Sequence, residues 1–358
     1  MNDVLFDVQH LSKVYDLGFG IGKKDAQSHE LYAVEEMSFT MIQGETLGVV
    51  GESGSGKSTM GRCLVGLEKP TEGTIRYKGQ DITHLGKREL HAIRKEMQIV
   101  FQNPVSSFNP RKSVGESLRE VAAFHGLSRE RSAERIRDLL DFVHLGEETL
   151  QSRSNGLSGG QLQRLAIVRA LIPNPSFILA DEPVSALDVS VQAQILRLFD
   201  DLKRRLGVST LFVSHDLTVV EHLCDRVIVM YLGAIVEMAP TRELFDRPLH
   251  PYTQSLLASR PREYPGQPVE RFELNGEIAG AIGRARNCRF HTRCPVAVTG
   301  VCDQERPQLL EVSPGHWVSC ILTDASRSIG DGFHVTHGVW KKRDEADINR
   351  LVPMRADD

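Results

Sequence analysis

The chain has 358 residues, of which 41% are apolar, so it can form one large domain or two ordinary ones with a substantial core. Lysine and arginine total 43 against 47 acidic residues, and this near balance, with a net charge of -4, gives no support for nucleic-acid binding. No run of 18 apolar residues exists and the N-terminus lacks a basic-then-apolar signal pattern, so we expect a cytosolic protein that does not itself cross a membrane.

The order of predicted elements favours an α/β fold. Short strands are predicted at 4–8 and 45–50, separated by a polar, glycine-rich loop at 18–30, and a helical pattern covers 60–67. Helical periodicity continues over 114–150, and further strands are predicted at 177–180 and 210–214. Strands that alternate with helices predict a mostly parallel sheet with helices on both faces. After about residue 248 prolines become frequent and the alternation stops, which indicates a smaller appended domain and then a polar, mobile tail at 325–358.

The segment between the strand at 45–50 and the helix at 60–67 reads GESGSGKS, which fits the phosphate-binding pattern G-x-x-x-x-G-K-[ST]. Glycines let the backbone wrap closely around phosphates, and the N–H groups at a helix N-terminus then face the anion. Lys57 is expected to reach the β- and γ-phosphates of ATP, and the Ser58 hydroxyl is expected to bind Mg²⁺. A glycine-rich turn before a helix is the alternative, but the flanking strand and helix favour a nucleotide site. The residues predicted to contact the nucleotide here are Gly51, Ser53, Gly54, Ser55, Gly56, Lys57, Ser58 and Thr59.

The strand at 177–180 ends in two acids, Asp181 and Glu182. A buried strand can carry acids only at its exit, where Asp181 is expected to hold Mg²⁺. Glu182 would then lie beside the γ-phosphate and polarise the attacking water as a general base. Two solvated acids at a strand end are common, so this pair indicates catalysis only because it follows a phosphate loop in the same chain.

A second predicted anion site lies at LSGGQ (157–161), which opens a helix with Ser158 as its N-cap. One nucleotide cannot occupy both anion sites of one chain unless the chain folds back, so a second subunit is predicted. LSGGQ matches the signature motif of the ABC ATPases, and the sequence resembles that family over about residues 4–245. The resemblance implies that ATP lies between the phosphate loop of one subunit and the signature residues of the other. Those signature residues are Ser158, Gly159, Gly160 and Gln161.

The resemblance also implies a fold and further site residues. The fold is a P-loop NTPase with a RecA-like core, an antiparallel β subdomain and a helical signature subdomain at about 95–165, together forming a nucleotide-binding domain over 1–247. Gln102 in VFQNP matches the glutamine that senses Mg²⁺ and the attacking water, and His215 in VSHD matches the histidine that contacts the γ-phosphate. Asp188 in SALD matches the aspartate that communicates across the dimer, and Tyr15 is the candidate for stacking on adenine.

Within this family the sequence between the motifs resembles the oligopeptide/dipeptide importer branch, and its F-type ATPase subunit in particular. The matching segments include MQIVFQNPVSSFNPR and HPYTQSLL (250–257). The resemblance implies peptide uptake at the cytoplasmic face of the membrane, with a D-type ATPase subunit, two transmembrane permease subunits and an extracytoplasmic binding protein as partners. The same motor role for another cargo, such as a nickel chelate or glutathione, and a soluble non-transport ABC ATPase are the alternatives.

Four of the six cysteines fall in the predicted C-terminal domain (248–324), at Cys288, Cys294, Cys302 and Cys320, with the spacing C-x₅-C-x₇-C-x₁₇-C. Cytosolic thiols stay reduced, so no disulfide framework is expected. The spacing fits neither paired zinc knuckles nor ordinary ferredoxins, so by itself it leaves zinc, an iron–sulfur cluster or unliganded thiols open. The segment resembles that of peptide-importer ATPases, which implies a [4Fe–4S] cluster. Cys63 and Cys224 are expected to be ordinary buried thiols.

Overall fold

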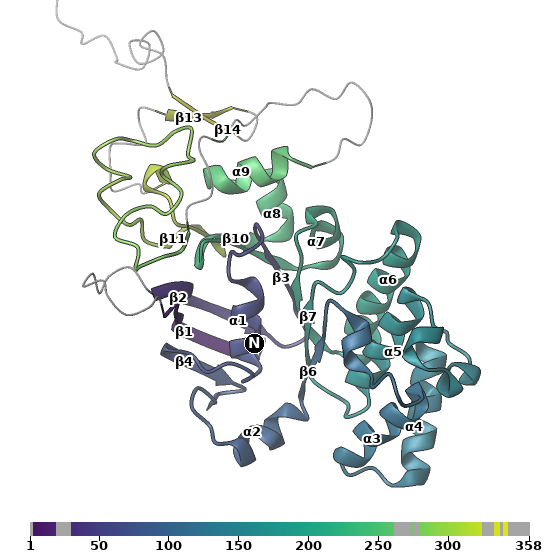
Figure 1. The fold of residues 1–358 in the computed structure, drawn as a ribbon. Coiled ribbons are helices and arrows are strands. Elements are labelled where there is room, and N and C mark those ends of the chain that lie inside the picture. The colour runs from purple at the N-terminus through teal and green to yellow at the C-terminus, as the bar shows by residue number, and fades with distance from the viewer. Residues whose placement is uncertain are drawn as a thin grey trace, which may run out of the picture. The chain divides into compact units, whose positions relative to one another are not determined.

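The computed structural model describes residues 3–18, 30–260, 274, 280–323, 333–336 and 339–342 (Figure 1). The chain divides into two compact units, each built from several stretches of sequence. The first unit contains Met1–Lys13, Val34–Val50 and Lys57–Asp225. The second contains Val14–Ala33, Gly51–Gly56 and Arg226–Asp358.

The centre of the first unit is a parallel sheet with the strand order β3-β8-β7-β6. Its strands are β3 (Thr46–Val50), β6 (Met97–Val100), β7 (Phe177–Asp181) and β8 (Ser209–Val213). All residues of β3, β7 and β8 are buried, which explains why these strands read as continuous apolar runs. The strands predicted at 45–50, 177–180 and 210–214 are therefore confirmed.

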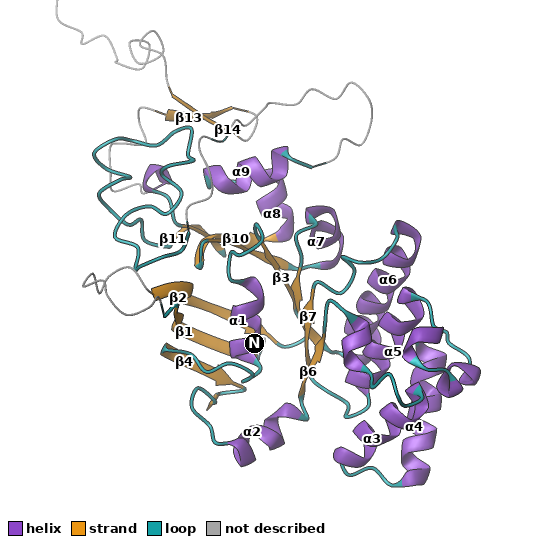
Figure 2. Cartoon of the chain, viewed as in Figure 1, coloured by secondary structure: helices purple, strands orange, loops and turns teal. Residues whose placement is uncertain are grey.

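Helices lie along this sheet (Figure 2). Helix α1 (Lys57–Leu64) packs against β7 and β8, α5 (Gly159–Leu171) packs against β6, and α7 (Leu217–Leu223) packs against β3. The long helix α6 (Val189–Leu206) packs against α5 and α7 and ends at Gly207, whose φ of 64° is the left-handed conformation common after helices. The predicted α/β architecture is confirmed for this unit.

A second, antiparallel sheet has the order β2-β1-β4-β5. It consists of β1 (Val4–Asp16), β2 (Glu30–Ile42), β4 (Glu72–Tyr77) and β5 (Gln80–Asp81). Phe6 of β1 pairs with Tyr77 of β4 and also packs edge-on against Phe177, with ring centroids 4.8 Å apart. The sequence predicted the start of β1 but not its full length, and residues 19–29 of the predicted loop lie outside the described residues.

The helical part of the first unit contains α2 (Lys87–Arg94), α3 (Val114–Phe124), α4 (Arg129–Phe142) and the short helices η1 (Pro104–Ser107), η2 (Glu147–Gln151) and η3 (Ser154–Gly156). The predicted helical stretch at 114–150 is divided at residues 125–128. Ser128 caps α4, because its hydroxyl accepts a hydrogen bond from the Arg131 amide at 3.3 Å.

The second unit contains an antiparallel sheet with the order β9-β10-β12-β11. Its elements are β9 (Arg226–Tyr231), β10 (Ala234–Pro240), β11 (Leu310–Ser313), β12 (His316–Val318), α8 (Thr241–Asp246), α9 (Pro251–Ala258) and η4 (Ile321–Thr323). Within the predicted tail at 325–358, β13 (Phe333–Thr336) and β14 (Val339–Lys342) pair as an antiparallel hairpin, and the mobility of this segment stays a prediction.

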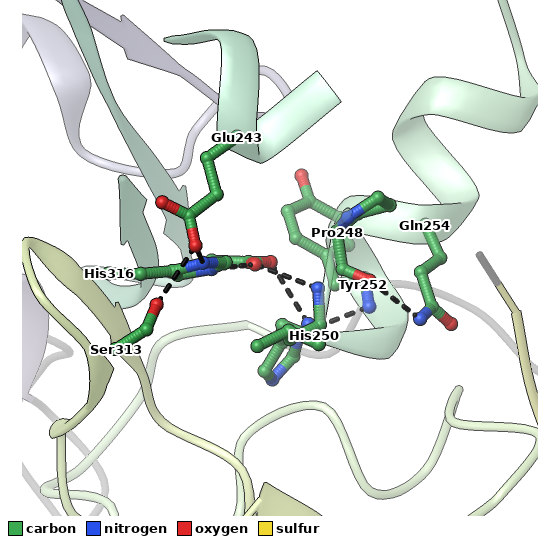
Figure 3. Close-up of polar contacts among 9 residues, drawn as sticks. Glu243, Pro248, His250, Tyr252, Gln254, Ser313 and His316 are labelled. Atoms are coloured by element: carbon green, nitrogen blue, oxygen red, sulfur yellow. Dashed lines mark hydrogen bonds and ion pairs between the residues drawn. The ribbon is translucent and has the colours of Figure 1, made fainter. Parts of the chain in front are cut away.

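Buried charged groups connect the elements of the second unit (Figure 3). The Glu237 carboxylate on β10 is fully buried and accepts hydrogen bonds from the backbone N–H groups of Leu249 and His250, at 2.8 and 2.9 Å. His316 on β12, also fully buried, lies between Glu237 at 2.7 Å and Glu243 at 3.1 Å. This network fixes the chain between α8 and α9 against the sheet.

Within the part of the chain that the structure describes, no helix combines the length and hydropathy needed to span a membrane.

Candidate functional site

The first six residues of the phosphate loop belong to the second unit, and their backbone requires glycine at two positions. Gly51 has φ of +151°, and a Cβ there would lie 2.2 Å from the Met230 carbonyl oxygen. Gly56 has φ of +98°, and a Cβ there would lie 1.9 Å from the Ala33 carbonyl oxygen. A side chain at either position would force the loop out of this path. Within the loop, the Ser55 N–H donates to the Glu52 carbonyl at 3.1 Å.

The remaining loop residues begin α1 in the first unit. The Ser58 hydroxyl donates to Asp181 Oδ1 at 2.7 Å, so the hydroxyl and the carboxylate expected to hold Mg²⁺ lie together although they are 123 residues apart. Lys57 is buried, with 5% of its surface exposed. Of the other predicted loop residues, Ser53 and Gly54 are exposed and Thr59 is half-buried.

Three candidate catalytic residues meet at one oxygen atom. Gln102 donates its amide N–H to Glu182 Oε2 at 3.0 Å, and His215 Nδ1 lies 3.4 Å from the same oxygen. Glu182 itself has φ of 49°, a left-handed backbone conformation that is uncommon outside glycine and often found at active sites. The arrangement places a carboxylate, an amide and an imidazole where one water molecule could contact all three.

The signature residues form the capped start of α5 in the first unit. The Ser158 hydroxyl accepts from the Gln161 N–H at 3.3 Å, and the Gln161 side chain accepts from the Ser158 N–H at 3.0 Å. Gly159 begins the helix, and Gly160 is buried so closely against α6 that a Cβ would lie 2.4 Å from Val191 Cγ1. The start of α5 is thus a capped helix N-terminus, at which Ser158 and Gly159 are exposed.

Asp188 caps the N-terminus of α6. Its Oδ1 accepts from the Val191 N–H at 3.0 Å and from the Ser190 hydroxyl at 2.7 Å. The bond from Ser190, followed by that from Val191, lowers the pKa of the Asp188 carboxyl, so this exposed acid stays ionised. Tyr15 is half-buried near the end of β1, and its stacking on adenine stays a prediction.

Sequence reasoning missed two features of the first unit. Ser185 lies within reach of the Gln102 amide at 3.3 Å, and its position three residues after Glu182 was the available signal. A cavity of about 590 Å³ lies beside β6, α2 and α3, which no local pattern indicates because its walls come from distant segments. Its lining includes Val65, Leu67, His91, Arg94, Met97, Gln98, Phe101, Glu120, Val121, Phe124, His125 and Arg169.

The four clustered cysteines line one small cavity of the second unit, about 20 Å³ in volume, which is room for about one water molecule. Burial raises the pKa of Cys288 to about 11 and that of Cys294 to about 12, and it also raises the pKa of Cys320. Four thiols on one cavity are a soft donor set suited to iron–sulfur or zinc chemistry. They are not closed around a metal, and among the described residues no three His, Cys, Asp or Glu side chains are grouped to hold one.

Cys63 and Cys224 behave as expected. Both are buried, and burial raises the pKa of Cys63 to about 12, so the thiol rather than the thiolate is present at neutral pH. Cys224 packs against Gly48 of β3, where a Cβ would lie 2.9 Å from the Cys224 sulfur.

Comparison with known proteins agrees with these motifs. Residues 34–185 match the family described as ABC transporter, and residues 236–302 match the C-terminal region of oligopeptide/dipeptide transporters. The chain is 44% identical to the oligopeptide transport ATP-binding protein AppF of Bacillus subtilis, over 89% of this chain and 98% of the relative. It is 42% identical to the dipeptide transport ATP-binding protein DppF of Haemophilus influenzae, over 90% of this chain and 98% of the relative.

Among solved structures, the chain resembles the dimeric ATP-binding cassette MJ0796 in a post-hydrolysis state with ADP and phosphate. The TM-score is 0.59 at 30% identity, and the match covers 66% of this chain and 99% of that one. The matched part is the cassette with its mixed α/β sheets. The phosphate loop, the strand-end acids and the signature helix thus occur together in the expected fold, and the chain belongs to the ABC transporter ATP-binding proteins of the oligopeptide/dipeptide branch.

Proposed function

We propose that this ABC ATPase is the motor of a peptide importer and that the residues grouped around Ser58 and Glu182 carry out ATP hydrolysis. The observation that carries the proposal is the meeting of Gln102 and His215 at Glu182 Oε2, at 3.0 and 3.4 Å. Glu182 accepts the proton of the attacking water, Gln102 orients that water, and His215 contacts the γ-phosphate.

Nucleotide and metal are bound by the motifs on either side of this group. The backbone of Gly51–Gly56 surrounds the phosphates and Lys57 contacts the β- and γ-phosphates. Ser58 and Asp181, already joined by a hydrogen bond of 2.7 Å, hold Mg²⁺, which when bound neutralises the charge that develops on the phosphates.

A second ATPase subunit completes each site. Ser158, Gly159, Gly160 and Gln161 form a helix start at which Ser158 and Gly159 are exposed, and Asp188 caps the start of α6. In the proposed assembly they contact the nucleotide bound by a paralogous D-type subunit, which returns the same contact. The dimeric solved relative supports a pairing of two ATPase subunits.

The proposed cargo is di- or oligopeptides, on the strength of relatives that are named for oligopeptide and dipeptide transport. Two permease subunits and an extracytoplasmic binding protein complete the importer, with this chain bound peripherally at the cytoplasmic face. A cytoplasmic helix of a permease subunit is the proposed occupant of the 590 Å³ cavity. Phe124, which lines the cavity and is 66% exposed, offers an apolar contact. Arg94 and Arg169 outnumber Glu120, the one acid among the described lining residues, and favour a helix of acidic character.

The four cysteines are proposed to bind a [4Fe–4S] cluster, which would give the C-terminal domain (248–324) a structural centre. The convergence of Cys288, Cys294, Cys302 and Cys320 on one cavity supports this assignment. The cavity, at about 20 Å³, is smaller than the cluster, so binding requires the four thiols to move apart while still facing a common centre. Anaerobic purification should yield about four irons and four sulfides per chain, with the brown colour lost in Cys294→Ser. Stoichiometric zinc without iron would contradict the assignment.

The motor role is tested by expressing the chain with its neighbouring permease genes and measuring peptide uptake. The complex should co-purify from membranes, and vesicles containing it should accumulate a labelled peptide only with ATP and the binding protein. Omission of this chain should abolish uptake. Failure to associate with any membrane complex, or equal uptake without this chain, would contradict the role. Competition by a nickel chelate or glutathione, but not by peptides, would reassign the cargo.

A further inference from the structure

Glu52, the second residue of the phosphate loop, is held by two residues from the C-terminal part of the same unit. Arg293 donates from Nη1 to Glu52 Oε2 at 2.8 Å and from Nη2 to Glu52 Oε1 at 3.0 Å, a two-pronged contact across 241 residues of sequence. The Tyr252 hydroxyl oxygen accepts a hydrogen bond from the Glu52 backbone N–H at 2.8 Å. Both the side chain and the amide of one loop residue are therefore anchored from outside the loop.

Arg293 can serve as an anchor because it is itself fixed. It is buried, with 7% of its surface exposed, and its guanidinium lies 5.8 Å from the centroid of the Tyr231 ring. Tyr231, Tyr252 and Phe290 pack on one another with ring centroids 4.7 to 5.4 Å apart. A guanidinium packed on such a cluster loses little further conformational freedom when it binds a carboxylate.

Tyr252 is fixed through the buried network of Figure 3. Its backbone N–H donates to His250 Nδ1 at 3.0 Å, which starts α9, and the His250 N–H donates to Glu237 at 2.9 Å. The aromatic ring is fully buried, so the hydroxyl has one direction in which to point. Sheet, helix and aromatic cluster thus all position the oxygen that meets the Glu52 amide.

A glycine-rich loop needs such anchors. Glu52 stands between Gly51 and the exposed residues Ser53 and Gly54, and glycine populates many backbone conformations. The Glu52 amide is occupied by Tyr252 and its carbonyl accepts the Ser55 N–H at 3.1 Å, so this residue holds the turn rather than contacting phosphate. A loop that spends only part of its time in the binding conformation has an apparent affinity reduced by that fraction.

We propose that Arg293 and Tyr252 are positioning residues for the phosphate loop, so that the segment after residue 248 sets the affinity of this cassette for ATP. The proposal rests on the nucleotide-binding role proposed above and extends it to residues that touch no nucleotide. It explains why an arginine beside Cys294 is buried: the C-terminal segment is bonded to the loop rather than merely appended to the cassette.

The test is a double-mutant cycle on ATP affinity in the full chain. Glu52→Gln and Arg293→Met each remove the ion pair while keeping side-chain volume, and each should weaken binding of a fluorescent ATP analogue by about 5- to 100-fold. The double variant should bind no more weakly than the weaker single variant, because both changes remove the same contact. Tyr252→Phe keeps the ring but removes the hydroxyl oxygen that accepts from the Glu52 amide, and should weaken binding within the same range.

Arg293→Lys keeps the positive charge but can make only one of the two hydrogen bonds to Glu52. It should recover part of the ATP affinity that Arg293→Met loses, which a purely structural role in the segment does not predict. Asn287→Ala is the matched control, since the hydrogen bond that it removes goes to the Asp303 carbonyl within the same segment rather than to the loop. It should leave ATP affinity unchanged, whatever it does to the melting temperature.

The outcomes separate the two proposals. No ATP binding by the wild-type chain would refute the nucleotide site itself. Wild-type binding together with affinities of Arg293→Met and Tyr252→Phe within twofold of it would overturn only the positioning role. Independent, multiplying effects of Glu52→Gln and Arg293→Met would overturn it as well. If Arg293→Met does not fold, the comparison of Tyr252→Phe and Arg293→Lys with wild type decides the question.

Discussion

Replacing Glu237 by leucine should destabilise the second unit strongly. The carboxylate accepts three hydrogen bonds, from the N–H groups of Leu249 and His250 and from His316 Nε2, and all lie in the interior. Leucine fills a similar volume but removes the Glu237 acceptor of both buried amides, at about 1–3 kcal/mol each. It also leaves His316 with Glu243 as its one carboxylate partner, and breaking a buried charged pair from one side costs about 3–5 kcal/mol. Together these terms give an expected loss of at least about 5 kcal/mol in the free energy of unfolding.

The assay is urea unfolding followed by tryptophan emission. The two tryptophans, Trp317 and Trp340, both belong to the second unit, so their signal reports on it even if the units unfold separately. The control is Arg242→Ala, which removes an exposed pair with Asp246 on α8 and should change stability by less than about 0.5 kcal/mol. A loss below about 1 kcal/mol in Glu237→Leu would refute the reasoning.

The same network predicts how the stability of the second unit changes with pH. Burial opposes the charged form of His316, but the hydrogen bonds and charges of Glu237 and Glu243 outweigh it, and the pKa of His316 is raised. The folded state therefore keeps this proton at pH values above the unfolded pKa of about 6.5. The stability that His316 contributes is fully present below that value and is lost as pH rises through the folded pKa. The difference between wild type and His316→Gln should thus shrink with rising pH, and a difference that grows would contradict the assignment.

Three further predictions concern the nucleotide site. Lys57→Ala should weaken ATP binding about 10- to 100-fold, measured by equilibrium titration, because a cation facing two phosphates is removed. Gly160→Ala should lower ATP turnover of the assembled importer, because its Cβ would lie 2.4 Å from Val191, a stiff β-branched side chain. Gly156→Ala should leave this turnover unchanged, because a Cβ at Gly156 would have no atom within 4 Å. The isolated chain should hydrolyse ATP slowly, with a rate per subunit that rises with concentration. A fast, concentration-independent rate would argue against the shared site.

The sequence was most informative where chemistry fixes the spacing. The phosphate loop could be predicted because its glycines and Lys57 must follow one another at set intervals, and β7 because a strand buried on both faces is a continuous apolar run. The pairing of Ser58 with Asp181 followed from the family pattern rather than from any local signal. The antiparallel strands were harder to predict, since β1 and β2 mix buried and exposed residues irregularly.

Contacts between distant segments that lie outside the nucleotide motifs could not be predicted. Nothing near Glu52 or Arg293 in the sequence indicates that they meet, because the contact depends on how α9 and the cysteine-rich segment pack. One signal was available and unused: Glu237 is an acid in the middle of the apolar strand AIVEMAP, and a buried acid needs partners. His316 in the short strand HWV was the partner that only the structure could identify.

The most direct test of the catalytic assignment is the turnover of Glu182→Gln in the assembled importer. Phosphate release should be measured at saturating ATP, with Asp246→Asn, an exposed acid on α8, as the control that keeps the wild-type rate. Glu182→Gln keeps the shape of the side chain and its contacts with Gln102 but removes the base. ATP binding should therefore persist while turnover falls by about 10²- to 10⁴-fold. A turnover close to that of the wild type would show that Glu182 is not the base.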